Sequence, residues 1–290
     1  MTGTGSVRRG IAAGLAFLLG AAACSTVLYN AGLGADPVTP TALSAQLAPT
    51  YRLTTPRGEG PFPTALLFSG CDGPRDNLET WAQALAEAEW ASLIVDSHSP
   101  RGLTEFERWR LVCMGQILTG EERAGDVAVA LADARRMPKV DPSRLALIGA
   151  SHGGWAVLEY LSSADHHDVP PTLTAWPLGA KPLDGVAAVL ALYPYCGELA
   201  QAPRRGWSSD IPVMLLLAQG DTITNEQPCL RMVRQAARNG LPVETHVYSG
   251  VTHGFDQRDK APLSTLDYFP AAAADAISRG TDFLNKAIGS

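Results

Sequence analysis

Hydrophobic positions follow two alternating patterns along most of the chain. Short apolar runs, typical of strands buried on both faces, are separated by longer segments whose apolar residues recur three or four positions apart. The strand-like runs lie at 64–68, 91–95, 144–148, 186–193, 213–218 and 243–248. The helical pattern occurs at 78–85, 121–136, 155–158, 227–239 and 271–287. This alternation predicts an α/β fold with a mostly parallel central sheet and helices on both faces.

The N-terminal region does not share this pattern and is typical of an exported protein. Arg8 and Arg9 precede an apolar stretch at 11–19, which is followed by small residues. The stretch is too short to favour a permanent membrane span. Residues 1–23 are therefore expected to be a signal peptide.

The residue after this segment is Cys24, and a cysteine in that position is similar to a bacterial lipobox. We expect Cys24 to carry a lipid anchor, although Ala21 stands where leucine is usual. The alternative is ordinary cleavage after Ala23. Residues 24–48 contain several glycines and prolines and are predicted to be a tether. Residues 49–290 are predicted to form one domain, because their number suits a single α/β domain. The protein would be periplasmic, or a membrane-anchored lipoprotein of a bacterium.

Composition narrows the classes of partner. The 290 residues are 46% hydrophobic and 18% charged, as in ordinary globular proteins. The formal charge is −6, and removal of residues 1–23 leaves 21 basic against 29 acidic residues, a charge of −8. An acidic domain of this kind is a poor partner for nucleic acid, so none is expected.

The apolar run at 144–148 leads into Gly149-Ala150-Ser151-His152-Gly153, which is followed by a helical pattern. A serine between two glycines at a sharp strand-to-helix turn is the nucleophile elbow of α/β-hydrolases, where larger side chains would collide with the neighbouring strand and helix. The pattern also arises by chance in glycine-rich chains, so its place after a buried strand carries the interpretation. We therefore predict an α/β-hydrolase fold with Ser151 as nucleophile.

A serine hydroxyl needs a base, and the base needs an orienting acid. In this fold both follow later strands, in the order Ser, Asp or Glu, His. Asp221 follows the run at 213–218, and His253 follows the run at 243–248. Either residue alone could occupy a loop by coincidence, whereas their joint order favours a triad. Asp256 competes as the acid, but it lies three residues from His253 and follows the wrong strand.

The tetrahedral intermediate of acyl transfer needs two N–H donors for its oxyanion. We expect one from His152, directly after the nucleophile, and one from Cys71 in the loop after the strand at 64–68; the alternative is a plain glycine turn at 69–73. The remaining histidines lack a partner pattern. His166 and His167, with Asp165 and Asp168, could suggest a metal site. Neighbouring residues of one loop do not supply the hydrogen-bond partners that orient metal ligands, so no metal site is predicted.

The chain from about 64 to 284 resembles the dienelactone hydrolase family of α/β-hydrolases. The residues that carry the resemblance are 69–73, 96–102, 149–154, 193–196, 220–221, 247–250 and 253–256. The resemblance implies hydrolysis of an ester or lactone through an acyl-enzyme. Two departures matter: founding members use a cysteine where this chain has Ser151, and Ser69 stands where related hydrolases often have histidine.

The sequence thus predicts an exported serine hydrolase that acts on carboxylic esters of small molecules and needs no cofactor. By the family resemblance, Arg101 lies near the site and could hold a substrate carboxylate; a surface or structural arginine is the equal alternative. A peptidase of the same fold is the rival enzyme. A catalytically silent envelope binding protein is the rival from another class, against which the intact triad argues.

Four cysteines remain after Cys24, an even number in a chain that would reach an oxidising compartment. Cys196 follows the strand at 186–193, and Cys229 lies eight residues past Asp221, so both are expected on adjacent loops at one sheet edge. Cys71 and Cys113 would then pair, tying the oxyanion loop to the segment after Arg101. Four separate buried thiols are the alternative.

Overall fold

The computed structural model describes Gly20, residues 36–260 and residues 264–289. The predicted signal peptide apart from Gly20, Cys24 and the first part of the predicted tether lie outside the described residues. Within the described part of the chain, no helix is both long and apolar enough to cross a membrane.

A seven-stranded sheet in the order β1-β3-β2-β4-β5-β6-β7 forms the centre of the domain. β1 runs antiparallel to β3 at one edge, and every other neighbouring pair is parallel. The strands are β1 (Arg52–Thr54), β2 (Phe62–Phe68), β3 (Ala91–Val95), β4 (Val140–Ala150), β5 (Val186–Leu192), β6 (Val213–Ala218) and β7 (Val243–Tyr248). The predicted α/β fold with a mostly parallel sheet is confirmed.

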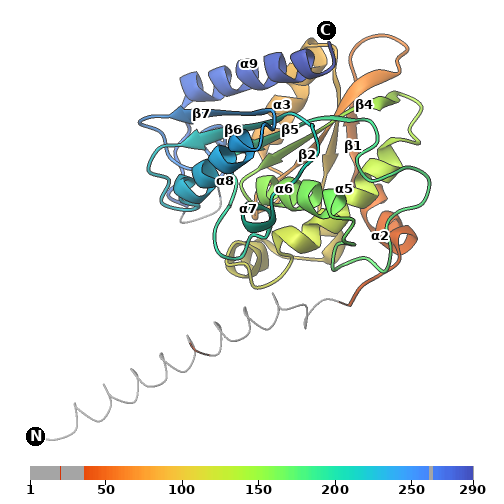
Figure 1. Cartoon of the computed structure of the whole chain (residues 1–290), viewed down its shortest axis with the longest axis horizontal. Coiled ribbons are helices and arrows are strands. Elements are labelled where there is room, and N and C mark those ends of the chain that lie inside the picture. Colours follow the sequence, from red (N-terminus) through yellow and green to blue (C-terminus); the bar gives the residue numbers. More distant parts are fainter. Residues whose placement is uncertain (1–19, 21–35, 261–263, 290) are drawn as a thin grey trace, which may run out of the picture.

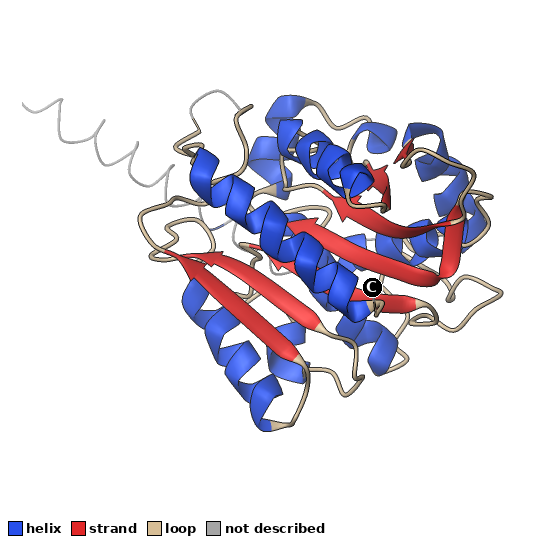
Figure 2. Cartoon of the chain, turned by 90° about the horizontal axis from the view of Figure 1, so that it is seen from above, coloured by secondary structure: helices blue, strands red, loops and turns tan. Residues whose placement is uncertain are grey.

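Helices cover both faces of this sheet (Figures 1 and 2). On one face lie α3 (Asp76–Glu87) and the long α9 (Pro270–Ala287), which pack a core around Trp81, Leu190 and Phe283. The other face carries α2 (Pro40–Leu47), α5 (Gly120–Ala134), α6 (His152–Asp165), α7 (Ala202–Arg205) and α8 (Glu226–Arg238). Because the central strands are covered on both sides, their sequences are nearly continuous apolar runs.

Short helical turns connect β3 to α5. They are η3 (Ser99–Arg101), α4 (Glu105–Glu107) and the π-helical η4 (Arg108–Val112). Two reciprocal caps bracket the segment, one at Thr104 with Glu107 and one at Thr119 with Glu122. The remaining short element is η2 (Ala48–Thr50), which leads from α2 into β1.

The prediction of a tether up to residue 48 is wrong for its last part, because residues 40–47 form α2 and join the domain. Thr39 caps the helix through its side chain, and Pro40 stands at the first helical position. Leu43 and Leu47, four residues apart, are fully buried in the core on the α5 side of the sheet. The packed domain therefore begins before residue 49.

Both predicted disulfides are present in the structure. Cys71 is bonded to Cys113, and Cys196 to Cys229. The first joins the loop after β2 to the end of η4, and the second joins the loop after β5 to α8. The expectation that Cys229 lies on a loop is wrong, because it lies in the first turn of α8. Disulfides of this kind are typical of extracellular or periplasmic proteins.

Candidate active site

Ser151 lies at a strained turn between β4 and α6. Its backbone φ is 53° and ψ is −113°, a conformation that L-residues rarely adopt. A Cβ on Gly149 would come within 2.2 Å of the Gly153 carbonyl oxygen, and a Cβ on Gly153 within 2.2 Å of the Phe68 carbonyl oxygen. Both elbow glycines are thus required by close backbone approach, as the sequence predicts.

The three predicted triad residues meet at the carboxyl ends of the parallel strands. His253, in the loop after β7, has its Nε2 2.8 Å from the Ser151 Oγ and its Nδ1 2.7 Å from an Asp221 carboxylate oxygen. Asp221 lies in the loop after β6. The chain Asp221, His253, Ser151 therefore has the geometry of an acid, a base and a nucleophile.

The surroundings of Asp221 keep its carboxylate ionised. One of its oxygens accepts from the Ile223 and Thr224 N–H groups at 2.8 and 3.0 Å, and the other accepts from the Thr224 hydroxyl. Burial acts to raise the pKa of Asp221, but the His253 ring and these N–H donors outweigh it and hold the pKa below its ordinary value. An ionised carboxylate at this position fixes the His253 tautomer with a proton on Nδ1.

Asp256, the competing acid, is hydrogen-bonded to other residues than His253. It is buried and accepts hydrogen bonds from the Trp81 indole at 3.0 Å and from the Tyr193 hydroxyl. Burial raises the pKa of Asp256, against the effect of these two donors. The ring of Tyr193 in turn contacts His253 edge-on, with 4.7 Å between ring centroids. Asp256 thus holds Tyr193, whose ring packs against His253, and does not itself orient the His253 ring.

The expected oxyanion donors lie on two backbone segments next to the nucleophile. His152 occupies the first position of α6, where N–H groups have no acceptor within the helix. Cys71 lines the same cavity as Ser151, in the loop after β2. Neighbouring Gly70 approaches the serine so closely that an added Cβ would lie 3.7 Å from the Ser151 Cβ.

Arg123 on α5 also reaches this region, on the side away from the cavity, and was not among the residues predicted for the site. Its guanidinium is fully buried and lies 3.0 Å from the Ser69 carbonyl oxygen, 3.0 Å from the His152 Nδ1 and 3.2 Å from the Ser97 hydroxyl. α5 also carries Glu121, Glu122 and Asp126, so the charge of Arg123 did not stand out in the sequence. No sequence signal identified the residues that Arg123 contacts.

Arg101, expected to hold a substrate carboxylate, is turned away from the cavity. Its guanidinium makes a two-pronged ion pair with buried Asp126, at 2.7 and 3.1 Å, and also donates to the Ser97 carbonyl oxygen. It does not line the cavity beside Ser151. These contacts support the alternative that Arg101 is a structural arginine.

The cavity above Ser151 has a volume of about 760 Å³. One side consists of the triad and the oxyanion loop. The other side is formed by three large apolar side chains from α4, η4 and the turn that follows, together with Ile223 and Leu266. We call these five residues the apolar wall: Phe106, Trp109, Met114, Ile223 and Leu266.

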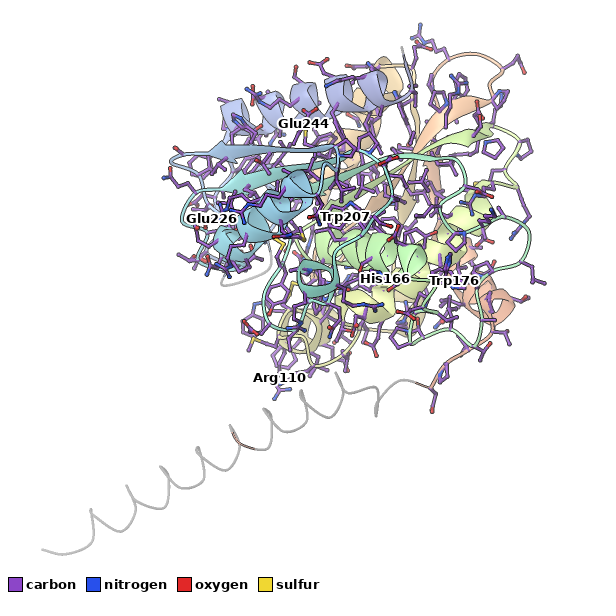
Figure 3. All side chains as sticks on the ribbon, viewed as in Figure 1. Arg110, His166, Trp176, Trp207, Glu226 and Glu244 are labelled. Carbon is purple, nitrogen blue, oxygen red and sulfur yellow. A yellow bond between two sulfur atoms is a disulfide. The ribbon has the colours of Figure 1, made fainter. Side chains whose placement is uncertain are left out.

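Residues 166–168 do not form a metal site. The His166 Nδ1 lies 2.8 Å from the Ser162 carbonyl oxygen, and Asp168 pairs with Arg205. Throughout the described residues, no group of three or more histidine, cysteine or acidic side chains is placed to hold a metal ion. His166 and Trp176, which mark the connection from α6 to β5, lie far from Arg110 on the cavity rim (Figure 3).

Solved structures with the same fold include several hydrolases. A putative dienelactone hydrolase from Klebsiella pneumoniae subsp. pneumoniae MGH 78578 is 19% identical, with a TM-score of 0.58 over 81% of this chain and 91% of that chain. Thermogutta terrifontis esterase 2, phosphorylated by paraoxon, is 12% identical, with a TM-score of 0.61 over 81% and 88%. At these identities the likeness shows the fold alone.

Among curated proteins, the protein usf of Aquifex pyrophilus matches over 66 residues at 32% identity. The match covers 23% of this chain and only 27% of that protein.

A doubly covered parallel sheet with a serine elbow between its fourth strand and the next helix defines an α/β-hydrolase. The sequence pattern of the dienelactone hydrolase family matches residues 50–288, nearly the whole described domain. The chain therefore belongs to the dienelactone hydrolase family, which places it among the carboxylic ester hydrolases. The expected family and fold are confirmed.

Proposed function

We propose that this protein hydrolyses small-molecule carboxylic esters through an acyl-enzyme on Ser151. The observation that carries the proposal is the continuous relay from the Asp221 carboxylate through His253 to the Ser151 hydroxyl, with links of 2.7 and 2.8 Å. This relay can remove the serine proton at the moment of attack, which is what a serine hydroxyl lacks in water.

In the first half-reaction the Ser151 Oγ attacks the ester carbonyl carbon, and its proton passes to the His253 Nε2. The His253 ring then gives this proton to the leaving alcohol as the carbon–oxygen bond breaks. In the second half-reaction, water repeats these steps on the acyl-enzyme and releases the acid. The N–H groups of Cys71 and His152 hold the negative oxygen in both tetrahedral intermediates.

Removal of the nucleophile tests this mechanism. Ser151→Ala should lower kcat for p-nitrophenyl esters by about 10³-fold or more and abolish labelling by a fluorophosphonate probe. Ser249→Ala, an exposed serine whose hydroxyl contacts Gln219, is the matched control and should keep both. Near-normal turnover by pure Ser151→Ala would overturn the proposal. Absence of probe labelling in the natural protein would favour a silent binding protein, and cleavage of peptides in preference to esters would favour a peptidase.

We further propose that the domain is exported and held at a membrane by a lipid on Cys24. The two disulfides support an oxidising compartment. The small residues before Cys24 support processing at that position. Cys24→Ser should release the protein from the membrane fraction, and mass spectrometry of an unmodified mature Cys24 would contradict the anchor.

A further inference from the structure

The apolar wall is exposed to an extent that apolar side chains seldom show. The side chains of Phe106, Trp109, Met114 and Ile223 are 65%, 46%, 66% and 57% exposed. All of them line the cavity beside Ser151. Large apolar groups gathered around a concave site indicate a ligand that covers them.

The charged groups near the cavity argue against an anionic substrate. Arg101 is paired with Asp126, so it offers no guanidinium to a carboxylate. Asp72 lines the cavity, and its carboxylate is held by Arg75 at 3.1 Å and Gln257 at 3.2 Å. The Asp72–Arg75 pair, like the Arg101–Asp126 pair, therefore supplies no uncompensated positive charge to bind a substrate carboxylate.

Among the described residues that line the cavity, Arg110 carries a positive charge. Its side chain is exposed, and Figure 3 shows it at the periphery of the molecule. The attraction of an exposed guanidinium for a substrate anion is weakened by water and salt. Arg110 is therefore a poor substitute for an enclosed carboxylate site.

Resting on the proposed function, we infer that the substrates are uncharged esters with a bulky apolar group, which packs against the apolar wall. The group is an aromatic ring or an alkyl chain, on the acyl or the alcohol side of the ester. Carboxylate-bearing lactones, by contrast, find no enclosed positive charge there, because Arg101 lies outside the cavity and Arg75 is paired with Asp72.

The test compares kcat/KM across two ester series. The acyl series runs from p-nitrophenyl acetate to the octanoate, and the alcohol series from ethyl acetate to 1-naphthyl acetate. In at least one series, kcat/KM should rise two- to fourfold for each carbon atom that packs on the wall. The mono-p-nitrophenyl ester of glutaric acid should react at least tenfold more slowly than the neutral pentanoate.

Trp109→Ala should then lower kcat/KM for the bulky esters by about tenfold or more, and leave the small acetate esters within about threefold. Leu178→Ala removes an equally apolar but unrelated side chain, 95% exposed and outside the cavity, and should change neither. Equal rates for neutral and anionic esters, or an equal effect of Trp109→Ala on small and bulky esters, would overturn the substrate class. Neither result would touch the triad, which Ser151→Ala tests separately.

A second observation concerns Arg123, whose buried guanidinium hydrogen-bonds to neutral acceptors. Burial of a charged group costs free energy unless ion pairs or hydrogen bonds compensate for the loss of water. The acceptors belong to the two segments of the expected oxyanion hole: Ser69 precedes Cys71 by two residues, and His152 is itself the second donor residue. The buried hydroxyl of Ser69 itself has no partner among the described residues.

We propose that Arg123 is a positioning residue for the oxyanion hole. By donating to the Ser69 carbonyl and the His152 Nδ1, it holds the two N–H groups in register for one oxygen atom. Its positive charge, enclosed behind them, also favours the negative oxygen of the tetrahedral intermediate. Because Arg123 donates to Nδ1, the His152 ring is neutral, and burial lowers the pKa of His152 well below its ordinary value.

In the test, the rate is divided by the concentration of active sites, which is titrated separately with the fluorophosphonate probe. The resulting kcat excludes unfolded protein. Arg123→Met should lower this kcat by about 10- to 100-fold while KM changes less than threefold. One guanidinium nitrogen, Nη1, makes both contacts, while Nε anchors the group on the Ser97 hydroxyl. Arg123→Lys keeps the charge but loses this anchored planar group, so an intermediate kcat is expected.

Arg135→Met is the matched control. Arg135 follows the same helix and donates to the Pro182 and Asp184 carbonyl oxygens, far from Ser151 in the fold. It should lose stability without losing kcat per labelled site. Unchanged kcat in both Arg123 variants, or an equal loss in Arg135→Met, would overturn the positioning role. If Arg123→Met fails to fold, the comparison of Arg123→Lys with Arg135→Met decides.

Discussion

The two sides of the cavity are built in opposite ways. The side with the triad lies at the ends of β4, β6 and β7, where Ser151, Asp221 and His253 follow strands of one sheet. The opposite side is a segment of short helical turns at 104–116 whose large apolar side chains are exposed. The central sheet determines where chemistry can occur, and a locally organised segment determines what fits beside it.

The segment at 104–116 contains only short helical turns, so few backbone hydrogen bonds stabilise its conformation. Its α4 helix has only three residues, and the Cys71–Cys113 bond ties its end to the oxyanion loop. We therefore expect a change in the apolar side to reach the oxyanion loop through this bond.

The largest expected effect separates the two aspartates near His253. Asp221→Asn should lower kcat by about 10³- to 10⁴-fold, because an amide nitrogen facing Nδ1 favours the wrong His253 tautomer. Asp256→Asn should leave kcat within tenfold but lower the free energy of unfolding by about 1–3 kcal/mol. It offers one acceptor to two buried donors, Trp81 and Tyr193. Steady-state kinetics and urea denaturation give the two quantities, and a large kcat loss in Asp256→Asn would contradict the roles assigned.

The two disulfides provide the next test. Their cysteines are 42 and 33 residues apart, so loss of either bond should cost a similar 2–4 kcal/mol of stability through greater freedom of the unfolded chain. Only replacement of Cys71 and Cys113 by alanine should also lower kcat/KM, by about tenfold. Replacement of Cys196 and Cys229 by alanine is the control. Equal kinetic effects in the two double variants would show that the first bond has no special connection with the site.

The strands were predictable because burial on both faces makes their sequences continuous apolar runs. The expected runs at 91–95 and 213–218 coincide with the fully buried β3 and β6. The expected strand at 243–248 also coincides with β7, although this edge strand is partly exposed and polar. The elbow was predictable for a related reason, since close backbone approach leaves room only for glycine. In contrast, α2 turns just Leu43 and Leu47 into the core and gave too weak a periodic pattern.

Side-chain partners across long sequence separations could not be predicted in the same way. Arg101 and Asp126 meet because the β3–α5 connection folds back on α5, and no spacing rule connects them. The contacts of Arg123 with Ser69 and His152 depend likewise on three elements packing together. The apolar side of the cavity showed neither a strand nor a helix pattern, which is why its residues were not expected at the site.

The free energy of unfolding should depend on pH in opposite ways for the buried carboxyl group of Glu159 and for the carboxyl groups of Glu105 and Glu107 on the short helical segment. Glu159 on α6 is buried and accepts from the Trp155 indole and the Gln201 and Ala202 N–H groups. Burial raises the pKa of Glu159 to about 7, against the effect of these donors. Its folded-state pKa lies above the ordinary 4.5, so its contribution to stability is present below pH 4.5 and is lost as pH rises to about 7.

The loss should amount to about 3 kcal/mol, and Glu159→Gln should remove it. Denaturant titrations of both proteins at several pH values between 4 and 8 measure the difference. The exposed Glu105 and Glu107 have their pKa values lowered, mainly by Arg75 and by the Thr104 N–H respectively. Their smaller contributions are instead present above pH 4.5 and are lost on acidification. A difference between natural protein and Glu159→Gln that is constant with pH would contradict the assignment to Glu159.

The smallest effect concerns the two capping boxes that bracket the segment. Thr119 and Glu122 begin the buried α5, with the Thr119 N–H donating to the Glu122 carboxylate at 2.7 Å. Thr104 and Glu107 make the same arrangement at 2.9 Å on the exposed side. Thr119→Ala should lower the free energy of unfolding by about 1 kcal/mol, because α5 is part of the core. Thr104→Ala should lower it by less than about 0.5 kcal/mol and instead speed amide hydrogen exchange at 105–112, because that turn opens without unfolding the domain. An equal loss of stability in both variants would mean that the apolar side folds as one unit with the sheet.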